Sequence, residues 1–195
     1  MLKRVFDFTF SFLGLLIMFP VFLFIAISIK LSTKGPIFYK QLRVGRNNKD
    51  FKIFKFRTMK LHSDKQGLLT VGGKDSRITS VGYYLRKYKL DELPQLINVF
   101  IGNMSFVGPR PEVRNYVNYY SEDQLKVLQV KPGITDLASI EFRNENDLLS
   151  NASDPNQFYI NEIMPKKIEI NLRYLENRSL LKDIIVIFKT FRAIL

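Results

Sequence analysis

An unbroken run of uncharged residues near the amino terminus limits this chain more than any other feature. Residues 8–29 are 22 positions without a charged side chain, and most of them are large and apolar. A straight helix of that length extends about 33 Å, close to the thickness of the hydrocarbon core of a bilayer. The sequence therefore predicts a helix that enters a membrane, which a water-soluble protein has no reason to carry.

The charges that flank this run predict how the helix lies in the membrane. Lys3 and Arg4 precede it, and Lys30 and Lys34 follow it. The positive-inside tendency favours both basic flanks on the cytoplasmic side. Pro20, near the middle, removes a helical hydrogen bond and favours a kink. We therefore predict a re-entrant membrane helix over residues 1–34, with residues 35–195 forming one unit on the cytoplasmic face.

Two other interpretations of the same run stay open. It could be an ordinary spanning anchor in which the kink at the proline is tolerated. It could also be a cleaved signal peptide, since Ala26-Ile27-Ser28 loosely resembles a cleavage site. The run is, however, longer than the apolar part of most signal peptides.

The charge of the chain predicts anionic partners but does not choose among them. There are 30 basic and 18 acidic residues, a net charge of +12, which favours nucleic acid, anionic lipid headgroups or phosphorylated small molecules. The lack of cysteine excludes disulfides, thiolate metal sites and a cysteine nucleophile. P-loop, dinucleotide-binding and zincin motifs are missing from the sequence, and the lone His62 is weak evidence for acid–base chemistry.

The remaining sequence predicts an α+β fold with little sheet. Apolar and basic residues alternate around a turn at residues 45–49, which predicts a small β-hairpin over residues 37–59. Residues 61–80 and 144–156 are polar and predict loops. Helical spacing predicts short surrounding helices at residues 81–89 and 116–130. A basic amphipathic helix from about Leu180 would lie on a membrane surface or pack on the protein's own core.

The acidic pair Asp91-Glu92 is the strongest candidate for chemistry. The apolar residues after the pair follow helical spacing, and Pro94 is tolerated only in the first turn of a helix. The pair therefore lies at a helix N-terminus, where backbone N–H groups stabilise negative charge. Adjacent carboxylates could share a divalent cation there, or one could attack phosphorus while the cation screens the phosphates. Simple helix capping by Asp91 is the alternative.

Basic residues on both sides of the acidic pair suit an anionic substrate. Arg86 lies just upstream, and Arg110 lies between two prolines, which restrict its backbone on both sides. A guanidinium held in this way can meet a phosphate in fixed bidentate geometry, although the same motif also suits a solvated surface turn. Lys55 and Arg143 are further candidate cations.

Together these motifs resemble the bacterial sugar transferases of the monotopic phosphoglycosyl transferase superfamily. The resemblance covers almost the whole chain, and in size the chain is similar to members that are little more than the catalytic domain. Besides the basic-flanked helix with its central proline, the resemblance rests on motifs that follow one another in the family order. These are Phe54-Lys55-Phe56-Arg57-Thr58-Met59, Asp91-Glu92-Leu93-Pro94-Gln95-Leu96, Asn98, Gly102, Met104-Ser105-Phe106-Val107-Gly108-Pro109-Arg110-Pro111 and Pro132-Gly133-Ile134-Thr135.

The resemblance implies transfer of a phosphosugar from a nucleotide diphosphate sugar, commonly a UDP-sugar, to a polyprenyl phosphate such as undecaprenyl phosphate. It implies that Asp91 attacks the β-phosphate of the donor, releases UMP and becomes a phosphosugar-aspartate. Glu92 would then help to deprotonate the acceptor, or order the site. Magnesium next to Asp91 would neutralise the phosphates.

The resemblance also implies the surroundings of the reaction. It assigns Lys55, Arg110 and Arg143 to phosphate binding, with Pro109 and Pro111 shaping the loop. It implies a re-entrant anchor in the bacterial inner membrane, with the active site on the cytoplasmic face, membrane lipid as a partner and no nucleic acid. A homo-oligomer stays possible.

The chain departs from the common family pattern at three places. Phe19 precedes the membrane proline where many members have serine, and Asn171 stands where some relatives have aspartate. Residues 136–142, beginning with Asp136, replace a Gly-Leu-Ala-Gln-Val-Asn-Gly run, so contacts to the sugar or nucleotide would differ. Two other functions stay open: a membrane-anchored binder of anionic lipid or nucleic acid, and a hydrolase of lipid-linked pyrophosphates.

Overall fold

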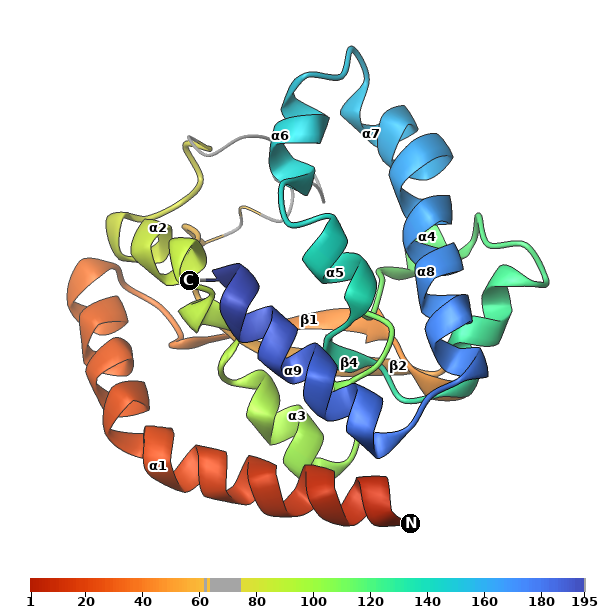
Figure 1. Ribbon diagram of the computed structural model, residues 1–195. Helices are drawn as coiled ribbons and strands as arrows, with labels where there is room; N and C mark the ends of the chain where they lie inside the picture. Colours follow the sequence, from red (N-terminus) through yellow and green to blue (C-terminus); the bar gives the residue numbers. More distant parts are fainter. Residues whose placement is uncertain (62, 64–74, 195) are drawn as a thin grey trace.

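The computed structural model describes residues 1–61, 63 and 75–194, and it combines many helices with two small sheets (Figure 1). This confirms the predicted α+β class. The helices are α1 (Leu2–Ser32), α2 (Ser80–Lys87), α3 (Gln95–Ile101), α4 (Arg114–Val117), α5 (Leu137–Glu141), α6 (Glu145–Ser150), α7 (Pro155–Phe158), α8 (Met164–Glu176) and α9 (Leu180–Ile194). The strands are β1 (Phe38–Val44), β2 (Asp50–Phe56), β3 (Ser105–Val107) and β4 (Gly133–Thr135).

The predicted hairpin is present. β1 and β2 pair antiparallel, from Phe38 opposite Phe56 to Val44 opposite Asp50. Two asparagines in the turn have positive φ, a backbone conformation that asparagine tolerates better than most residues. β3 and β4 form a separate parallel pair. Most of the loop predicted at residues 61–80, and the lone His62, lie outside the described residues.

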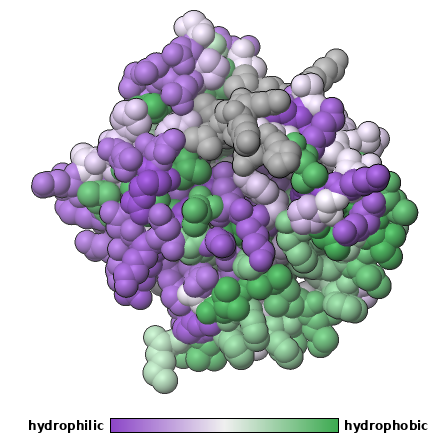
Figure 2. Space-filling model, turned by 180° about the vertical axis from the view of Figure 1, so that it is seen from behind, coloured by the Kyte–Doolittle hydropathy of each residue, from purple (hydrophilic) through white to green (hydrophobic). Residues whose placement is uncertain are grey.

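α1 is a single long helix that changes direction part-way along its length (Figure 1). Pro20 lies inside it, as the sequence predicts. Only 11% of the most apolar stretch of α1 is buried, so α1 is not an ordinary core helix. Figure 2 shows the resulting band of hydrophobic surface along one side of an otherwise largely hydrophilic face. The large side chains exposed along its middle are Phe12, Leu13, Leu16, Ile17, Phe19, Val21, Leu23 and Phe24.

Polar side chains attach the beginning of α1 to the rest of the protein. The Arg4 guanidinium donates to the carbonyl oxygens of Val99 and Phe100 at 2.7 Å each, where α3 ends. Asp7 is 2% exposed, and its Oδ1 accepts a hydrogen bond from Ser105 Oγ at 3.0 Å. A buried aspartate is tolerated here because its charge is hydrogen-bonded.

Both ends of α1 therefore rest on the same body. Near its beginning, Lys3 also forms an ion pair with the buried Asp183 of α9. Near its end, Ile25 and Ile29 are buried in a cluster with Phe56 of the hairpin. Between these two attachments α1 changes direction (Figure 1), and Phe12 still packs on Phe100 of α3 with ring centroids 6.1 Å apart.

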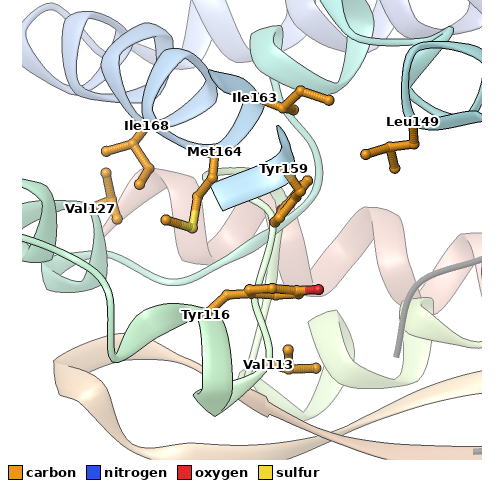
Figure 3. Packing of buried hydrophobic residues seen from close by; sticks show 8 residues of the cluster. All are labelled: Val113, Tyr116, Val127, Leu149, Tyr159, Ile163, Met164 and Ile168. Atoms are coloured by element: carbon orange, nitrogen blue, oxygen red, sulfur yellow. The ribbon is translucent and has the colours of Figure 1, made fainter. Parts of the chain in front are cut away.

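The main apolar core lies at the other side of the domain, among α4, α6 and α8 (Figure 3). Side chains from these elements and from the turns between them pack around two tyrosine rings, which are tilted by 54° with their centroids 4.8 Å apart. The buried members of this cluster are Val113, Tyr116, Val127, Leu149, Tyr159, Ile163, Met164 and Ile168. The apolar neighbours of the acidic pair, Leu90 and Leu93, pack instead against the cluster that contains Phe56.

Two predictions about the C-terminal half are wrong. Residues 116–130 do not form one helix, because α4 ends at Val117 and a separate 3-10 turn covers Gln124–Gln129. Ser121 starts that second element, since its Oγ accepts from the backbone N–H of Gln124 at 3.3 Å. Residues 144–156 contain α6 rather than only loop, because Leu149 is drawn into the core, where it is 1% exposed.

Candidate active site

The acidic pair lies in a tight connection between α2 and α3. Lys89 has a φ of 56° and a ψ of 18°, in the left-handed region, and reverses the chain after α2. A 3-10 turn over Leu90–Glu92 follows, and Pro94 leads into α3. The pair thus stands directly before a helix N-terminus, as predicted. Left-handed backbone at a residue other than glycine is uncommon and is concentrated at functional sites.

Asn98 fixes α3 against the hairpin and so brings Lys55 to the acidic pair. The Asn98 side chain is fully buried. Its Oδ1 accepts from the backbone N–H of Phe54 at 2.9 Å, and its Nδ2 donates to the carbonyl of Lys52 at 2.8 Å. These bonds satisfy backbone groups at the edge of β2 as a neighbouring strand would. Lys55, the residue after Phe54, then reaches Glu92.

Glu92 is held by two cations. Its Oε1 accepts from Lys55 Nζ at 3.0 Å and from Arg110 Nη2, and its Oε2 accepts from Arg110 Nη1 at 3.1 Å. The Arg110 contact is bidentate, the strongest arrangement for a guanidinium and a carboxylate. Burial alone would raise the pKa of Glu92, but the charges of Arg110 and Lys55 hold it well below its ordinary value. Glu92 is therefore a carboxylate with little tendency to take a proton.

Asp91, unlike Glu92, is buried without a cation from the described part of the chain bound to its carboxylate. Asp91 is 8% exposed. Among the described residues, none donates a hydrogen bond to its carboxylate. Burial raises the pKa of Asp91, and the positive charges of Lys55, Arg86 and Lys89 only partly oppose this. A carboxylate with few partners is more basic and more nucleophilic than one that is fully paired. Burial also disfavours the charged form of Lys55, which lowers the pKa of its amine.

The Pro-Arg-Pro loop is locked to the segment that contains β4. The backbone N–H of Gly108 donates to the Thr135 carbonyl, and that of Gly133 donates to the Pro109 carbonyl, each at 3.1 Å. A Cβ on Gly108 would lie 2.5 Å from the Lys131 carbonyl oxygen, so the two segments approach too closely for a side chain. Pro109 and Pro111 are buried, and their role in shaping the loop stays a prediction.

Asp136 is a polar residue of this site to which the sequence analysis gave no role. It is 1% exposed. Its Oδ2 accepts from the backbone N–H of Arg110 at 2.7 Å, and its Oδ1 caps α5 by accepting from Ser139 N. An aspartate directly before a short apolar segment is the usual pattern of a helix N-cap, so a signal was available.

The other predicted cations lie at different distances from the acidic pair. Arg86 is half-buried in the last turn of α2, and its charge acts on Asp91. Arg143 is exposed just beyond the end of α5. Within the part of the chain that the structure describes, no hydrogen bond or ion pair joins Arg143 to Asp91 or Glu92. Its predicted phosphate contact stays a prediction.

Comparison with known proteins decides the family. The family described as Bacterial sugar transferase matches residues 1–195. This chain belongs to that family. The resemblance carried by the acidic pair and the Pro-Arg-Pro loop is thereby confirmed.

Several curated relatives of this bacterial sugar transferase carry functional names. UDP-glucose:undecaprenyl-phosphate glucose-1-phosphate transferase of Escherichia coli is 39% identical and is matched over 97% of this chain and 39% of its own length. UDP-N-acetylgalactosamine-undecaprenyl-phosphate N-acetylgalactosaminephosphotransferase of Aeromonas hydrophila is 36% identical, over 100% of this chain and 44% of its own. The chain thus spans less than half the length of these two proteins. Sugar transferase EpsL of Bacillus subtilis, named as uncharacterized, is 36% identical and is matched over 87% of its length.

The magnesium ion that the family resemblance implies fits the residues around Asp91. Both oxygens of Glu92 are occupied by cations, whereas the Asp91 carboxylate is available. Among the described residues, no group of three or more His, Cys, Asp or Glu side chains could hold a metal ion. Magnesium is commonly bound by one or two carboxylates together with substrate phosphates. Asp91 is the residue that would hold such an ion, and magnesium binding stays a prediction.

Proposed function

We propose that this bacterial sugar transferase moves a phosphosugar from a UDP-sugar to undecaprenyl phosphate and releases UMP. The observation that carries the proposal is the contrast between the adjacent carboxylates: Asp91 is buried with few partners, while Glu92 neutralises two cations. The Escherichia coli and Aeromonas hydrophila relatives are named for reactions of this type. Their names support both the donor class and the acceptor.

In the first step, a carboxylate oxygen of Asp91 attacks the β-phosphorus of the donor. An O–P bond to Asp91 forms, and the bond from the β-phosphorus to the bridging oxygen breaks. UMP leaves with that electron pair, so the sugar phosphate stays on Asp91 as an acyl phosphate. Magnesium, when bound, screens the negative charge of the phosphates. Lys55 and Arg110 lie where they can take over the charge that develops on the diphosphate.

In the second step, a phosphate oxygen of the acceptor attacks the same phosphorus. The bond to Asp91 breaks and the carboxylate is regenerated, leaving the sugar joined to the lipid through a diphosphate. A phosphate monoester loses its second proton near pH 6, so the acceptor needs little help from a base at neutral pH. Of the two roles left open for Glu92, its low pKa favours ordering the cations over deprotonating the acceptor.

The acceptor is a lipid, and the surface of the protein suits a membrane. Both ends of α1 rest on the same body, which favours a helix that returns to the face from which it entered rather than one that crosses. α9 adds a second apolar surface, because its buried Asp183 and Val186 face the domain while its opposite side is exposed. The large exposed side chains of α9 are Leu181, Ile185, Phe188 and Phe191. We assign this face to the cytoplasmic leaflet of the inner membrane.

Thiol labelling tests the re-entrant arrangement directly, because the chain has no cysteine of its own. Leu2 and Leu31 are 79% and 83% exposed at the two ends of α1. We expect Leu2→Cys and Leu31→Cys to react with a membrane-impermeant maleimide in inside-out vesicles, and neither to react in spheroplasts. Phe19→Cys, in the middle of α1, serves as the lipid-embedded control and stays unlabelled in both. Labelling of the two ends from opposite sides would establish a spanning anchor instead.

Nucleotide release tests the reaction itself. Purified protein in detergent is incubated with a panel of UDP-sugars, magnesium and undecaprenyl phosphate, and UMP is measured. Sustained UMP release that requires both metal and acceptor is the expected result. Without acceptor, we expect no more than one equivalent of UMP and a phosphosugar adduct on Asp91 by mass spectrometry. A membrane-anchored binder would give no UMP, and a pyrophosphatase would give inorganic phosphate from lipid diphosphate without nucleotide.

A further inference from the structure

Arg110 has an unusual backbone environment. Because both of its neighbours are prolines, Arg110 supplies the sole backbone N–H within the Pro-Arg-Pro tripeptide. That N–H donates to Asp136 Oδ2 at 2.7 Å. We propose that Asp136 is a positioning residue, which fixes Arg110 for its contact with the diphosphate of the donor. The inference rests on the proposed function.

Asp136 is itself rigidly held. It follows β4, whose last residue, Thr135, accepts a hydrogen bond from Gly108 just before the tripeptide. Its second carboxylate oxygen accepts from Ser139 N at the start of α5. One buried carboxylate therefore joins three elements: β4, α5 and the loop that carries Arg110.

The fixed backbone of Arg110 directs its guanidinium toward Glu92. The Arg110 side chain is 31% exposed and reaches Glu92, with a further contact from Nη1 to the Ile134 carbonyl at 3.4 Å. The negative charges of Glu92 and, to a smaller extent, Asp136 raise the pKa of Arg110. A guanidinium that binds two oxygens at once depends on the direction in which its backbone points it. Loss of the Asp136 contact would remove the hydrogen bond that holds the Arg110 backbone itself.

Two substitutions separate this role from helix capping. Asp136→Asn keeps the size of the side chain but supplies one acceptor oxygen where two are used. Asp136→Ser supplies one oxygen that caps α5, since serine is as good an N-cap as aspartate, but it is too short to reach Arg110 as well. The matched control is Asp154→Asn, because Asp154 caps α7 through Asn156 N and Gln157 N and is exposed away from the site.

Calorimetric binding of UDP with magnesium to the full-length protein in detergent tests the proposal. We expect Asp136→Asn and Asp136→Ser to weaken UDP binding about tenfold, while Asp154→Asn binds as the wild type does. The decisive measurement is the double-mutant cycle with Arg110→Ala, which removes the guanidinium but keeps the N–H. In that background, Asp136→Ser should change UDP affinity less than about twofold.

Three results would count against this account, and they are distinguishable. Wild-type affinity in both Asp136 variants, or an undiminished loss in the Arg110→Ala background, would overturn the positioning role alone. If the wild-type protein itself failed to bind UDP and to release UMP, the proposed function would fall, and this inference with it. Should Asp136→Asn fail to fold, Asp136→Ser still decides the question because α5 stays capped.

Discussion

Replacing Asp91 with asparagine is expected to abolish phosphosugar transfer and to make the folded protein more stable. Turnover should fall at least about 10³-fold, because the amide cannot form the acyl phosphate through which the reaction proceeds. Stability should rise by about 1 kcal/mol, because the substitution removes a buried charge that lacks adequate partners. Thermal unfolding and UMP release from the same preparation measure both effects. Asp147→Asn, at an exposed aspartate of α6, is the control and should change neither.

The stability difference between the wild type and Asp91→Asn is expected to depend on pH. Burial raises the pKa of Asp91 in the folded state, so the folded protein binds this proton more tightly than the unfolded chain does. The wild type therefore loses stability relative to Asp91→Asn as the pH rises through that raised pKa, and the two converge in acid. Wild-type transfer should fall as the pH drops through the same pKa. A stability difference independent of pH would contradict the assignment.

Replacing the neighbouring Glu92 with glutamine is expected to act in the opposite direction on stability. The change leaves Lys55 and Arg110 facing each other without the carboxylate between them. We expect a loss of about 2 kcal/mol, below the range for fully buried pairs because both cations are partly exposed. Transfer should fall about 10²-fold, since the phosphate-binding cations lose their fixed positions. Thermal unfolding and the kcat and KM for donor measure these effects.

An exposed ion pair provides the control for Glu92. Glu169 pairs with Arg173 one turn along α8, and both side chains are well exposed. Glu169→Gln should therefore change stability by less than about 0.5 kcal/mol. If Glu92→Gln raised stability, or left transfer intact, Glu92 would not be the group that orders the two cations. A general disturbance of the turn would lower stability in both variants, so it could not explain a gain for Asp91→Asn beside a loss for Glu92→Gln.

Regular local patterns were sufficient to predict the hairpin, the long apolar helix and the amphipathic α9. The hydrophobic period of each element lies within one short stretch of sequence, so it can be recognised without any distant contact. The segments at residues 116–130 and 144–156 were predicted wrongly because their structure depends on contacts that periodicity does not contain. Ser121 restarts a turn by a side-chain hydrogen bond, and α6 forms where Leu149 meets the distant core.

In the candidate site, too, local features could be predicted and those that depend on distant contacts could not. The sequence identifies Asp91 and Glu92 as a pair but cannot tell which one is neutralised, because Lys55 and Arg110 lie 37 and 18 residues away from Glu92 along the chain. The fold brings them together through Asn98 and through the loop beside β4. Asp136 was noted only as a departure from the family pattern, since its partner, the N–H of Arg110, lies 26 residues earlier.

The ion pair between Lys3 and Asp183 has a consequence for how the protein is made. The two residues are 180 positions apart, so α1 leaves the ribosome long before α9 exists. On the proposed membrane location, a helix that enters the lipid during synthesis does so while its lysine still lacks this partner, and the attachment closes only after α9 is synthesised. A nascent chain stopped before α9 would hold the beginning of α1 through Arg4 and Asp7 but not through Lys3.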